Sequence, residues 1–181
     1  DVQNDFADPD GSLFVAGAPA AVPFINQQIE AALEASATIV YTRDWHPETT
    51  PHFAKDGGIW PVHCVKDTWG SEFHADLVVA GPEVKKGIGG EDGYSGFSVR
   101  DPETGARAAT ALERLLSDAA ITDVVVVGLA TDYCVKETAL DATRLGFTTS
   151  VLADGIRAVN LSPGDGARAI AEMVNAGVGV E

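Results

Sequence analysis

The run DVVVVG, residues 123–128, constrains the fold of this chain more than any other feature. Its four consecutive valines have no polar residue between them, and such solid apolar runs are typical of parallel strands that are covered on both faces. A helical pattern precedes the run, with Leu112, Leu115, Leu116 and Ala119 spaced to lie on one face. A helix that leads into a buried strand is the repeating unit of α/β folds.

Similar units occur elsewhere in the chain. Residues 19–35 carry apolar side chains at helical spacing, and the β-branched run at 37–42 predicts a buried strand after them. Residues 136–146, closed by a glycine as a C-cap, predict a helix that leads into a strand at 148–154. A last helix, from about residue 164 to 176, precedes the short apolar segment VGV.

These alternating helices and strands predict a three-layer α/β/α sandwich around a mainly parallel central sheet. The length of 181 residues, without a linker or an internal repeat, favours a single domain over residues 1–181. The chain opens on DVQNDF, a polar motif with no element before it. We therefore expect a further strand upstream of Asp1, outside these residues.

Charge and composition exclude several classes of partner. The formal charge of −15, from 27 acidic and 12 basic residues, repels nucleic acid and anionic membranes, because both bind proteins through Lys and Arg. No apolar run approaches the roughly 18 residues needed to span a bilayer. Two cysteines are too few for a disulfide framework, so we expect a reducing compartment and a cytoplasmic location, with a single disulfide as the alternative.

Chemically competent side chains follow several of the expected strands. Asp44 follows the run IVYT, Lys86 ends the short segment EVKK, and Cys134 follows the valine run. If a strand precedes Asp1, that residue lies at a fourth strand end. Ligands of open α/β sheets bind beyond the carboxyl ends of the strands, so these segments are expected to meet at one edge.

The stretch DWHPETTPH places Asp44, His46 and His52 in one loop. One carboxylate and two imidazoles suit a divalent transition metal ion such as zinc, iron or manganese. His63 is close enough in sequence to be a further ligand or to hydrogen-bond to one. The alternative is that Asp44 caps a turn and the histidines are solvated.

Cys134 lies just before an expected helix, where unpaired N–H groups and the helix dipole favour a thiolate. The alternative is a small buried hydrophobic residue, which is what we expect of Cys64. Asp1 and Lys86 complete a possible set, since a nucleophilic thiol needs a proton acceptor and a carboxylate beside a lysine stays charged. The alternatives are a surface lysine and a polar terminal residue.

With these residues in place, the chain resembles the nicotinamidase/pyrazinamidase family of isochorismatase-like cysteine hydrolases. The resemblance covers essentially the whole length and keeps the family's order and nearly its spacing. It rests on the motifs DVQNDF, DWHPETTPHF, WPVHC, KKG followed by YSGF, and GLATDYC. The family often has His at the position of Tyr133, a neighbour of the nucleophile rather than a part of the triad.

This resemblance implies a catalytic triad of Asp1, Lys86 and Cys134. The implied reaction is hydrolysis of nicotinamide, and also of pyrazinamide, through a thioester. Asp1 takes the thiol proton, and Lys86 balances the charges. The resemblance also implies an oxyanion hole from the backbone N–H groups of Ala130 and Cys134, and a cis peptide bond between Leu129 and Ala130.

The resemblance further implies one divalent metal ion, Zn, Fe or Mn, which grips the pyridine nitrogen of the substrate directly or through a water. Its expected ligands are Asp44, His46 and His52, with His63 as a fourth. Three aromatic side chains are expected beside the substrate ring, with core packing as the alternative: Phe6, Trp60 and Tyr94.

Two other functions stay open. One is a metal-free relative that hydrolyses a ureidoacrylate, carbamoylsarcosine or isochorismate; the Asp-x-His-x5-His stretch argues against it. The other is a binding module that keeps the fold without catalysis; the set of Asp1, Lys86 and Cys134 argues against that. The oligomeric state, including a homo-oligomer, is left open.

Overall fold

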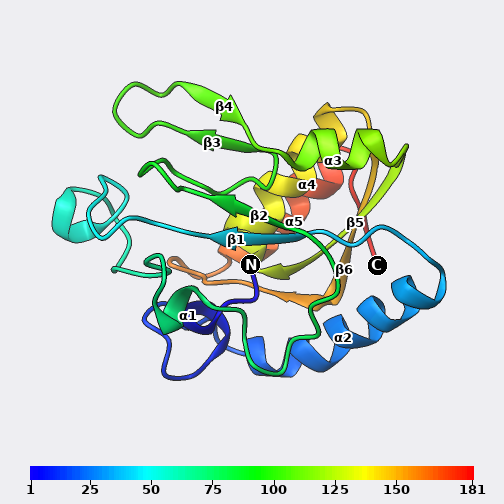
Figure 1. Cartoon of the computed structure of the whole chain (residues 1–181), viewed down its shortest axis with the longest axis horizontal. Helices are drawn as coiled ribbons and strands as arrows, with labels where there is room; N and C mark the ends of the chain where they lie inside the picture. The colour runs from blue at the N-terminus through cyan, green and yellow to red at the C-terminus, as the bar shows by residue number, and fades with distance from the viewer.

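The computed structural model describes residues 1–181 and has an α/β architecture, in which helices lie on both sides of parallel strands (Figure 1). This confirms the predicted fold class. Turns of 3-10 helix occupy Ala54–Asp56 and Trp69–Ser71, and a π-helical turn occupies Thr131–Val135. The helices and strands, in chain order, are α1 Asn4–Ala7, α2 Ala18–Glu34, β1 Tyr41–Asp44, β2 Glu83–Lys86, β3 Ser98–Arg100, β4 Arg107–Ala109, α3 Leu112–Asp118, β5 Asp123–Leu129, α4 Lys136–Arg144, β6 Thr148–Arg157, α5 Asp165–Asn175 and β7 Gly179–Val180.

The strands form two parallel sheets and one hairpin. β1 pairs with β2 in a register that sets Asp44 opposite Lys86. β5, β6 and β7 form a three-stranded parallel sheet, whose register shifts between Val126 and Gly128. β3 and β4 form an antiparallel hairpin, which the sequence pattern did not predict because each strand has only three residues.

The side chains of β5 alternate between two helical layers. Val127 packs against the apolar cluster that contains Val22 and Ile25 of α2. Val126 packs against the cluster that contains Met173 of α5 and Ala139 of α4. Because successive side chains of a strand point to opposite faces, α2 covers one face, and α4 and α5 cover the other (Figure 1).

The helices predicted from apolar spacing all form. α2 and α5 lie within one or two residues of their expected bounds, and α3 carries Leu112 and Leu116 into the core. α4 ends as expected at a glycine: Gly146 has a φ of +93°, and the Phe147 N–H donates to the Ala142 carbonyl at 3.1 Å. A left-handed residue with this hydrogen bond satisfies carbonyls that the end of a helix leaves unpaired.

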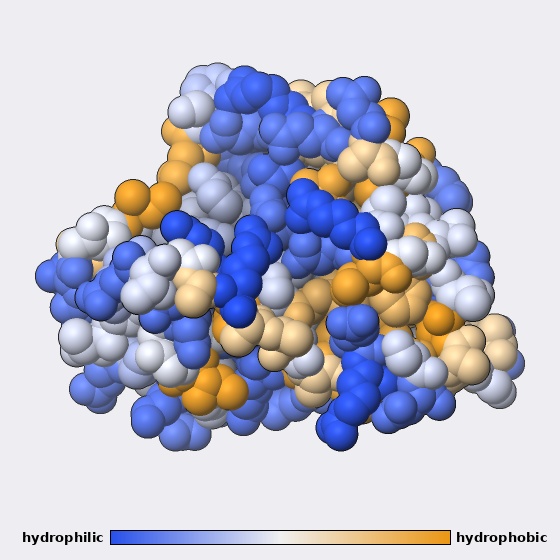
Figure 2. All heavy atoms as spheres, turned by 90° about the horizontal axis from the view of Figure 1, so that it is seen from above, coloured by the Kyte–Doolittle hydropathy of each residue, from blue (hydrophilic) through white to orange (hydrophobic).

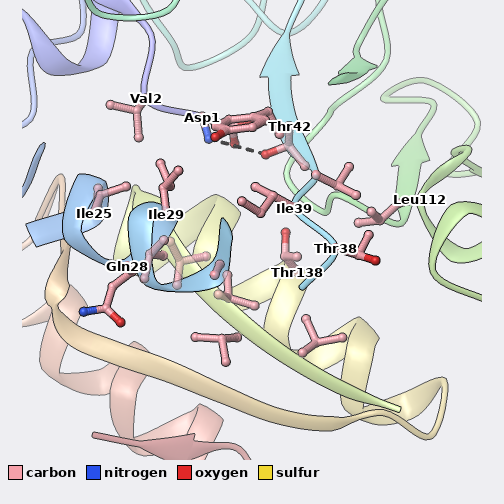
Figure 3. A pocket seen from close by; sticks show the side chains of 18 of the residues that line it. Asp1, Val2, Ile25, Gln28, Ile29, Thr38, Ile39, Thr42, Leu112 and Thr138 are labelled. Atoms are coloured by element: carbon pink, nitrogen blue, oxygen red, sulfur yellow. Dashed lines mark hydrogen bonds between the residues drawn. The ribbon is translucent and has the colours of Figure 1, made fainter. Parts of the chain in front are cut away.

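An apolar cavity of about 510 Å³ lies between the two parallel sheets (Figure 3). It is lined mainly by hydrophobic side chains from α2, from residues 37–42 and from β5. β1 pairs only with β2, and β5 pairs only with β6, so each strand has one edge without a strand partner. We call this cavity the inter-sheet slot.

Two predictions about the strands bordering this slot are wrong in part. The ladder of β1 begins at Tyr41 rather than at residue 37, and Ile39 and Val40 are only half-buried. Within the valine run, which was predicted to be covered on both faces, Val125 is 60% exposed. Both segments border the slot, where no neighbouring strand supplies hydrogen-bond partners or covers the side chains.

The outer surface mixes hydrophilic and hydrophobic regions. Figure 2 shows that hydrophilic residues cover much of one face and that hydrophobic residues lie in patches between them. No helix is long and apolar enough to cross a membrane.

Candidate active site

The carboxyl ends of the parallel strands gather the predicted reactive residues. Asp44 and Lys86 are the last residues of β1 and β2, and they face each other in the ladder. Cys134 follows β5 directly, in the π-helical turn that leads into α4. One side-chain atom of each of Asp1, Asp44 and Cys134 lies within 4.8 Å of the others. The expected convergence at one sheet edge is therefore present.

Lys86 is the centre of this group. Its side chain is 0% exposed, and its ammonium donates to Asp1 Oδ2 at 2.7 Å and to the Gly93 carbonyl at 2.6 Å. Asp44 Oδ1 lies 2.9 Å from the same nitrogen. Burial alone would lower the pKa of Lys86, but Asp44 and Cys134 outweigh it and raise that pKa. Lys86 is thus a buried, permanently charged ammonium.

The Asp44 carboxylate keeps its negative charge because the Lys86 ammonium lies beside it. Burial alone would raise the pKa of this carboxyl, but Lys86, followed by His46, holds it well below its usual range. Its other oxygen, Oδ2, lies 3.9 Å from His46 Nε2. Asp44 therefore stands between Lys86 and the histidines.

Asp1 and Cys134 are placed for proton transfer. The Asp1 side chain is 2% exposed, and while Lys86 holds its Oδ2, its Oδ1 is buried without a hydrogen-bond partner. Burial raises the pKa of the Cys134 thiol above its ordinary value, and the Lys86 ammonium only partly offsets this. The effect of the helix start on this thiol stays a prediction, and burial of Cys134 acts in the opposite direction.

The turn that carries Cys134 is built around a cis peptide bond. That bond joins Leu129 and Ala130, the pair for which the family resemblance implies it. The backbone N–H of Ala130 donates to no backbone carbonyl. The Asp132 carboxylate anchors the turn, because it accepts the N–H groups of Val159 at 2.9 Å and Asn160 at 2.8 Å.

The DVQNDF motif holds Asp1 in place through its other polar residues. Gln3 is 0% exposed, and its amide donates to the Asp44 carbonyl at 2.8 Å and to the Ser71 carbonyl at 2.9 Å. Its Oε1 accepts the Asp44 N–H at 2.7 Å. The Asp5 carboxylate accepts the Cys64 N–H at 2.7 Å. The first segment is thereby tied to β1 and to the loop of Cys64.

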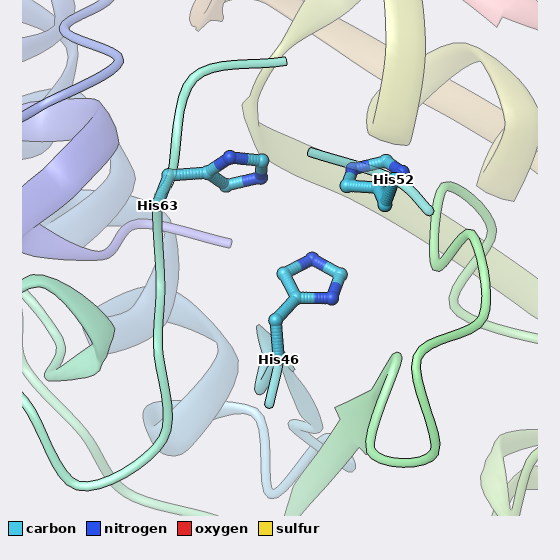
Figure 4. Close-up of side chains that lie close together, drawn as sticks. All are labelled: His46, His52 and His63. Carbon is cyan, nitrogen blue, oxygen red and sulfur yellow. The ribbon is translucent and has the colours of Figure 1, made fainter. Parts of the chain in front are cut away.

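Three histidines converge beside this group, each from a different segment (Figure 4). One ring nitrogen of each of His46, His52 and His63 lies within 4.8 Å of the others, and all three residues are buried. We call these three residues the histidine cluster. Both ring nitrogens of His46 are buried without a hydrogen-bond partner. The cluster thus offers lone pairs that no group of the protein uses.

These histidines are suited to hold a metal ion. Burial lowers the pKa of His46 to about 4 and also lowers that of His63, so both are neutral near pH 7. Ligands bound about 2.1 Å from one ion lie roughly 3–4 Å apart, and the 3.9 Å between Asp44 Oδ2 and His46 Nε2 fits that spacing. The three histidines are therefore suited to hold one divalent ion, and Asp44 Oδ2 lies beside His46 where it could add a fourth ligand.

Aromatic side chains surround the histidine cluster. The Trp60 indole N–H donates to the Tyr94 hydroxyl at 2.8 Å, and the two rings lie 6.4 Å and 5.6 Å from the His52 ring. Phe6 lies 5.5 Å from His63. The three predicted aromatic residues thus border the cluster, although Phe6 and Trp60 are also buried in packed surroundings.

Two residues that contact this group were not predicted from the sequence to be site residues. Asp92 contacts His52 Nδ1 at 2.7 Å across 40 positions, and no local pattern signals such a contact. Tyr133 packs edge-on against Trp60, with ring centroids 4.7 Å apart, and lies 5.7 Å from Tyr94. Its position next to Cys134 was the available signal.

Known proteins resemble this chain over nearly its whole length. Residues 1–180 match the isochorismatase domain family. The chain is 35% identical over 195 residues to the nicotinamidase of Escherichia coli (strain K12), covering 98% of this chain and 89% of that relative.

Solved structures give the same result. The pyrazinamidase of Pyrococcus horikoshii in complex with zinc has a TM-score of 0.88 and 37% identity, covering 100% of this chain and 94% of that one. PnC1 from L. infantum in complex with nicotinate has a TM-score of 0.86 and 35% identity, covering 100% and 88%. The chain belongs to the isochorismatase family.

Proposed function

We propose that this chain is a cysteine amidohydrolase that converts nicotinamide to nicotinate and ammonia, and that it also accepts pyrazinamide. The observation that carries the proposal is the buried Lys86 ammonium, which pairs with Asp1 and Asp44 beside the Cys134 thiol. The substrate class is supported by relatives, since one is a nicotinamidase and another has been solved with nicotinate.

In the first half-reaction the Asp1 carboxylate takes the proton of the Cys134 thiol. Asp1 Oδ1 suits this role because it is buried and has no other partner. The sulfur attacks the carboxamide carbon, and the backbone N–H groups of Ala130 and Cys134 stabilise the oxyanion. Asp1 passes the proton to the amide nitrogen, the C–N bond breaks, and ammonia leaves a thioester on Cys134.

In the second half-reaction Asp1 accepts a proton from a water that attacks the thioester carbonyl. The C–S bond then breaks, nicotinate leaves, and the proton returns to the sulfur. Lys86 stays an ammonium throughout, because its neighbours raise its pKa. Its charge offsets the negative charge that moves between the carboxylate and the sulfur.

Asp44, His46, His52 and His63 would hold one zinc, iron or manganese ion. When bound, such an ion supplies a Lewis-acid site for the pyridine nitrogen of the substrate, directly or through a water. The histidine cluster and the Asp1–Lys86–Cys134 group lie on the two sides of Asp44. A pyridine ring held at the histidine cluster can present its carboxamide to the Cys134 sulfur. This lowers the entropic cost of the nucleophilic attack.

The aromatic residues would hold the faces of the pyridine ring. Phe6, Trp60 and Tyr94 border the histidine cluster, and the hydrogen bond between Trp60 and Tyr94 fixes two of these rings relative to each other. Pyrazinamide has the same ring shape with a second nitrogen, so the same contacts would accept it.

An ammonia-release assay on nicotinamide tests the reaction and the metal requirement together. We expect turnover that a chelator abolishes and that zinc, iron or manganese restores. Turnover that resists chelation, with less than about half an equivalent of metal bound, would instead identify a metal-free amidohydrolase. Metal binding without ammonia release would identify a binding module.

The compartment is part of the same proposal. Cys64 and Cys134 are both unpaired and buried, which agrees with the expected reducing, cytoplasmic location. Every side chain in the proposed chemistry comes from one chain. The chemistry is therefore the same whether or not the chain forms a homo-oligomer.

A further inference from the structure

We propose that Asp92 is a positioning residue for the metal site: its carboxylate holds the proton of His52 on Nδ1 and so presents Nε2 as the ligand. This inference rests on the proposed function, since it concerns the ion that the histidine cluster would hold. Asp92 Oδ1 lies 2.7 Å from His52 Nδ1, and its side chain is 13% exposed. A carboxylate only accepts, so the ring nitrogen in this contact must donate.

Asp92 is itself held in place by Arg100, the last residue of β3 in the hairpin. Its N–H donates to the Arg100 carbonyl at 2.8 Å, and the Arg100 N–H donates to the Asp92 carbonyl at 2.9 Å. The Arg100 guanidinium adds a 3.4 Å contact to Oδ2, which leaves Oδ1 for His52. The carboxylate is thus fixed both by backbone pairing and by charge before any ion arrives.

The other two histidines have weaker support. His63 Nδ1 contacts the neutral carbonyl of Pro61 at 2.7 Å, within its own loop. Both ring nitrogens of His46 lack a partner. His52 is therefore the member of the cluster whose outer nitrogen meets a carboxylate at hydrogen-bond distance. Such a partner fixes the tautomer and raises the basicity of the ligating nitrogen, and its loss typically costs about 10–100-fold in metal affinity.

The test is zinc affinity of Asp92→Asn, measured by competition with a chromophoric chelator. We expect a loss of about 10–100-fold relative to the unchanged protein, and an altered visible spectrum of the cobalt-loaded form. Glu91→Gln is the matched control, because it removes the same charge one residue away, where the carboxylate only accepts the Gly89 N–H. We expect that control to stay within about 2-fold.

Equal zinc affinities of Asp92→Asn and Glu91→Gln would overturn the inference. A melting temperature of the metal-free Asp92→Asn protein lowered by more than a few degrees would also overturn it, because the role would then be structural. Absence of zinc binding in the unchanged protein would instead refute the proposed metal site itself, so the two failures are distinguishable.

Discussion

Asp44 and Lys86 end two neighbouring parallel strands in register, and their side chains form a 2.9 Å ion pair that is almost fully buried. The same ammonium pairs with Asp1 at 2.7 Å, so one cation holds two carboxylates that would otherwise repel each other. The strand register therefore decides the electrostatics of the site.

Replacing Lys86 by Met should remove this cation while keeping much of its shape. We expect the free energy of unfolding to fall by about 3–5 kcal/mol, because two buried carboxylates lose their partner, and ammonia release to fall by at least ~100-fold. Urea unfolding and the ammonia assay measure both effects. Lys85→Met is the control, since Lys85 is partly exposed and should cost less than about 1 kcal/mol. Equal losses for the two variants would contradict the central role of Lys86.

Substitutions of the two cysteines should distinguish a role in catalysis from a role in core packing. Cys134→Ala should lower ammonia release from nicotinamide by at least ~1,000-fold, because the proposed nucleophile is gone, with little change in stability. Cys64 is 0% exposed, so Cys64→Ala should cost about 1 kcal/mol of unfolding free energy but retain turnover. Parent-level ammonia release by Cys134→Ala would rule out the thioester route.

The metal-free protein should lose stability as the pH falls. Burial lowers the pKa of His46 from 6.5 to about 4, so between these values the unfolded chain binds more protons than the folded chain. The free energy of unfolding should therefore decrease as the pH drops from 6.5 toward 4, by on the order of 2–3 kcal/mol from this residue. His63, whose pKa is also lowered, acts in the same direction.

Urea unfolding in the presence of a chelator at several pH values measures this effect. The free energy of unfolding of His46→Asn should change less with pH across the same range, because Asn does not titrate. An unchanged slope in that variant would mean that His46 is not neutral in the folded protein.

The Trp60–Tyr94 pair should affect substrate binding more than chemistry. Trp60→Phe and Tyr94→Phe each remove one end of their 2.8 Å hydrogen bond, and we expect each to raise KM for nicotinamide about 3–10-fold with a smaller change in kcat. The double variant should show less than additive loss, since the two residues share one contact. Trp69→Phe, at a tryptophan that is 49% exposed, should leave KM unchanged. An equal change of KM in Trp69→Phe would contradict a specific role of the Trp60–Tyr94 pair in substrate binding.

The convergence of the candidate residues could be predicted because parallel strands direct their carboxyl ends to one edge. Asp44 and Cys134 follow apolar runs and Lys86 ends the short segment EVKK, so their convergence could be predicted without knowing any distance. Helix positions were equally accessible, since apolar spacing and a C-terminal glycine are local signals.

What the sequence could not supply depends on contacts that are distant along the chain. Asp92 meets His52 because the hairpin folds back onto the loop, and nothing near either residue indicates this. Burial raises the pKa of Cys134, and that burial depends on several segments at once rather than on the local sequence. The exposure of Val125 depends on which strands lie beside it rather than on its own run of valines.

Gln3 acts as a substitute for one unit of main chain: it offers a donor and an acceptor to the backbone of Asp44, as an adjacent strand would. Its carboxylate analogue, Glu, has the same outline but could fill only half of that pattern. The spacing between Asp1 and β1 consequently depends on Gln3, which belongs neither to the proposed triad nor to the histidine cluster and its aromatic neighbours. Substitutions of Gln3 would therefore change the reactivity of the site without replacing any residue that takes part in the proposed reaction.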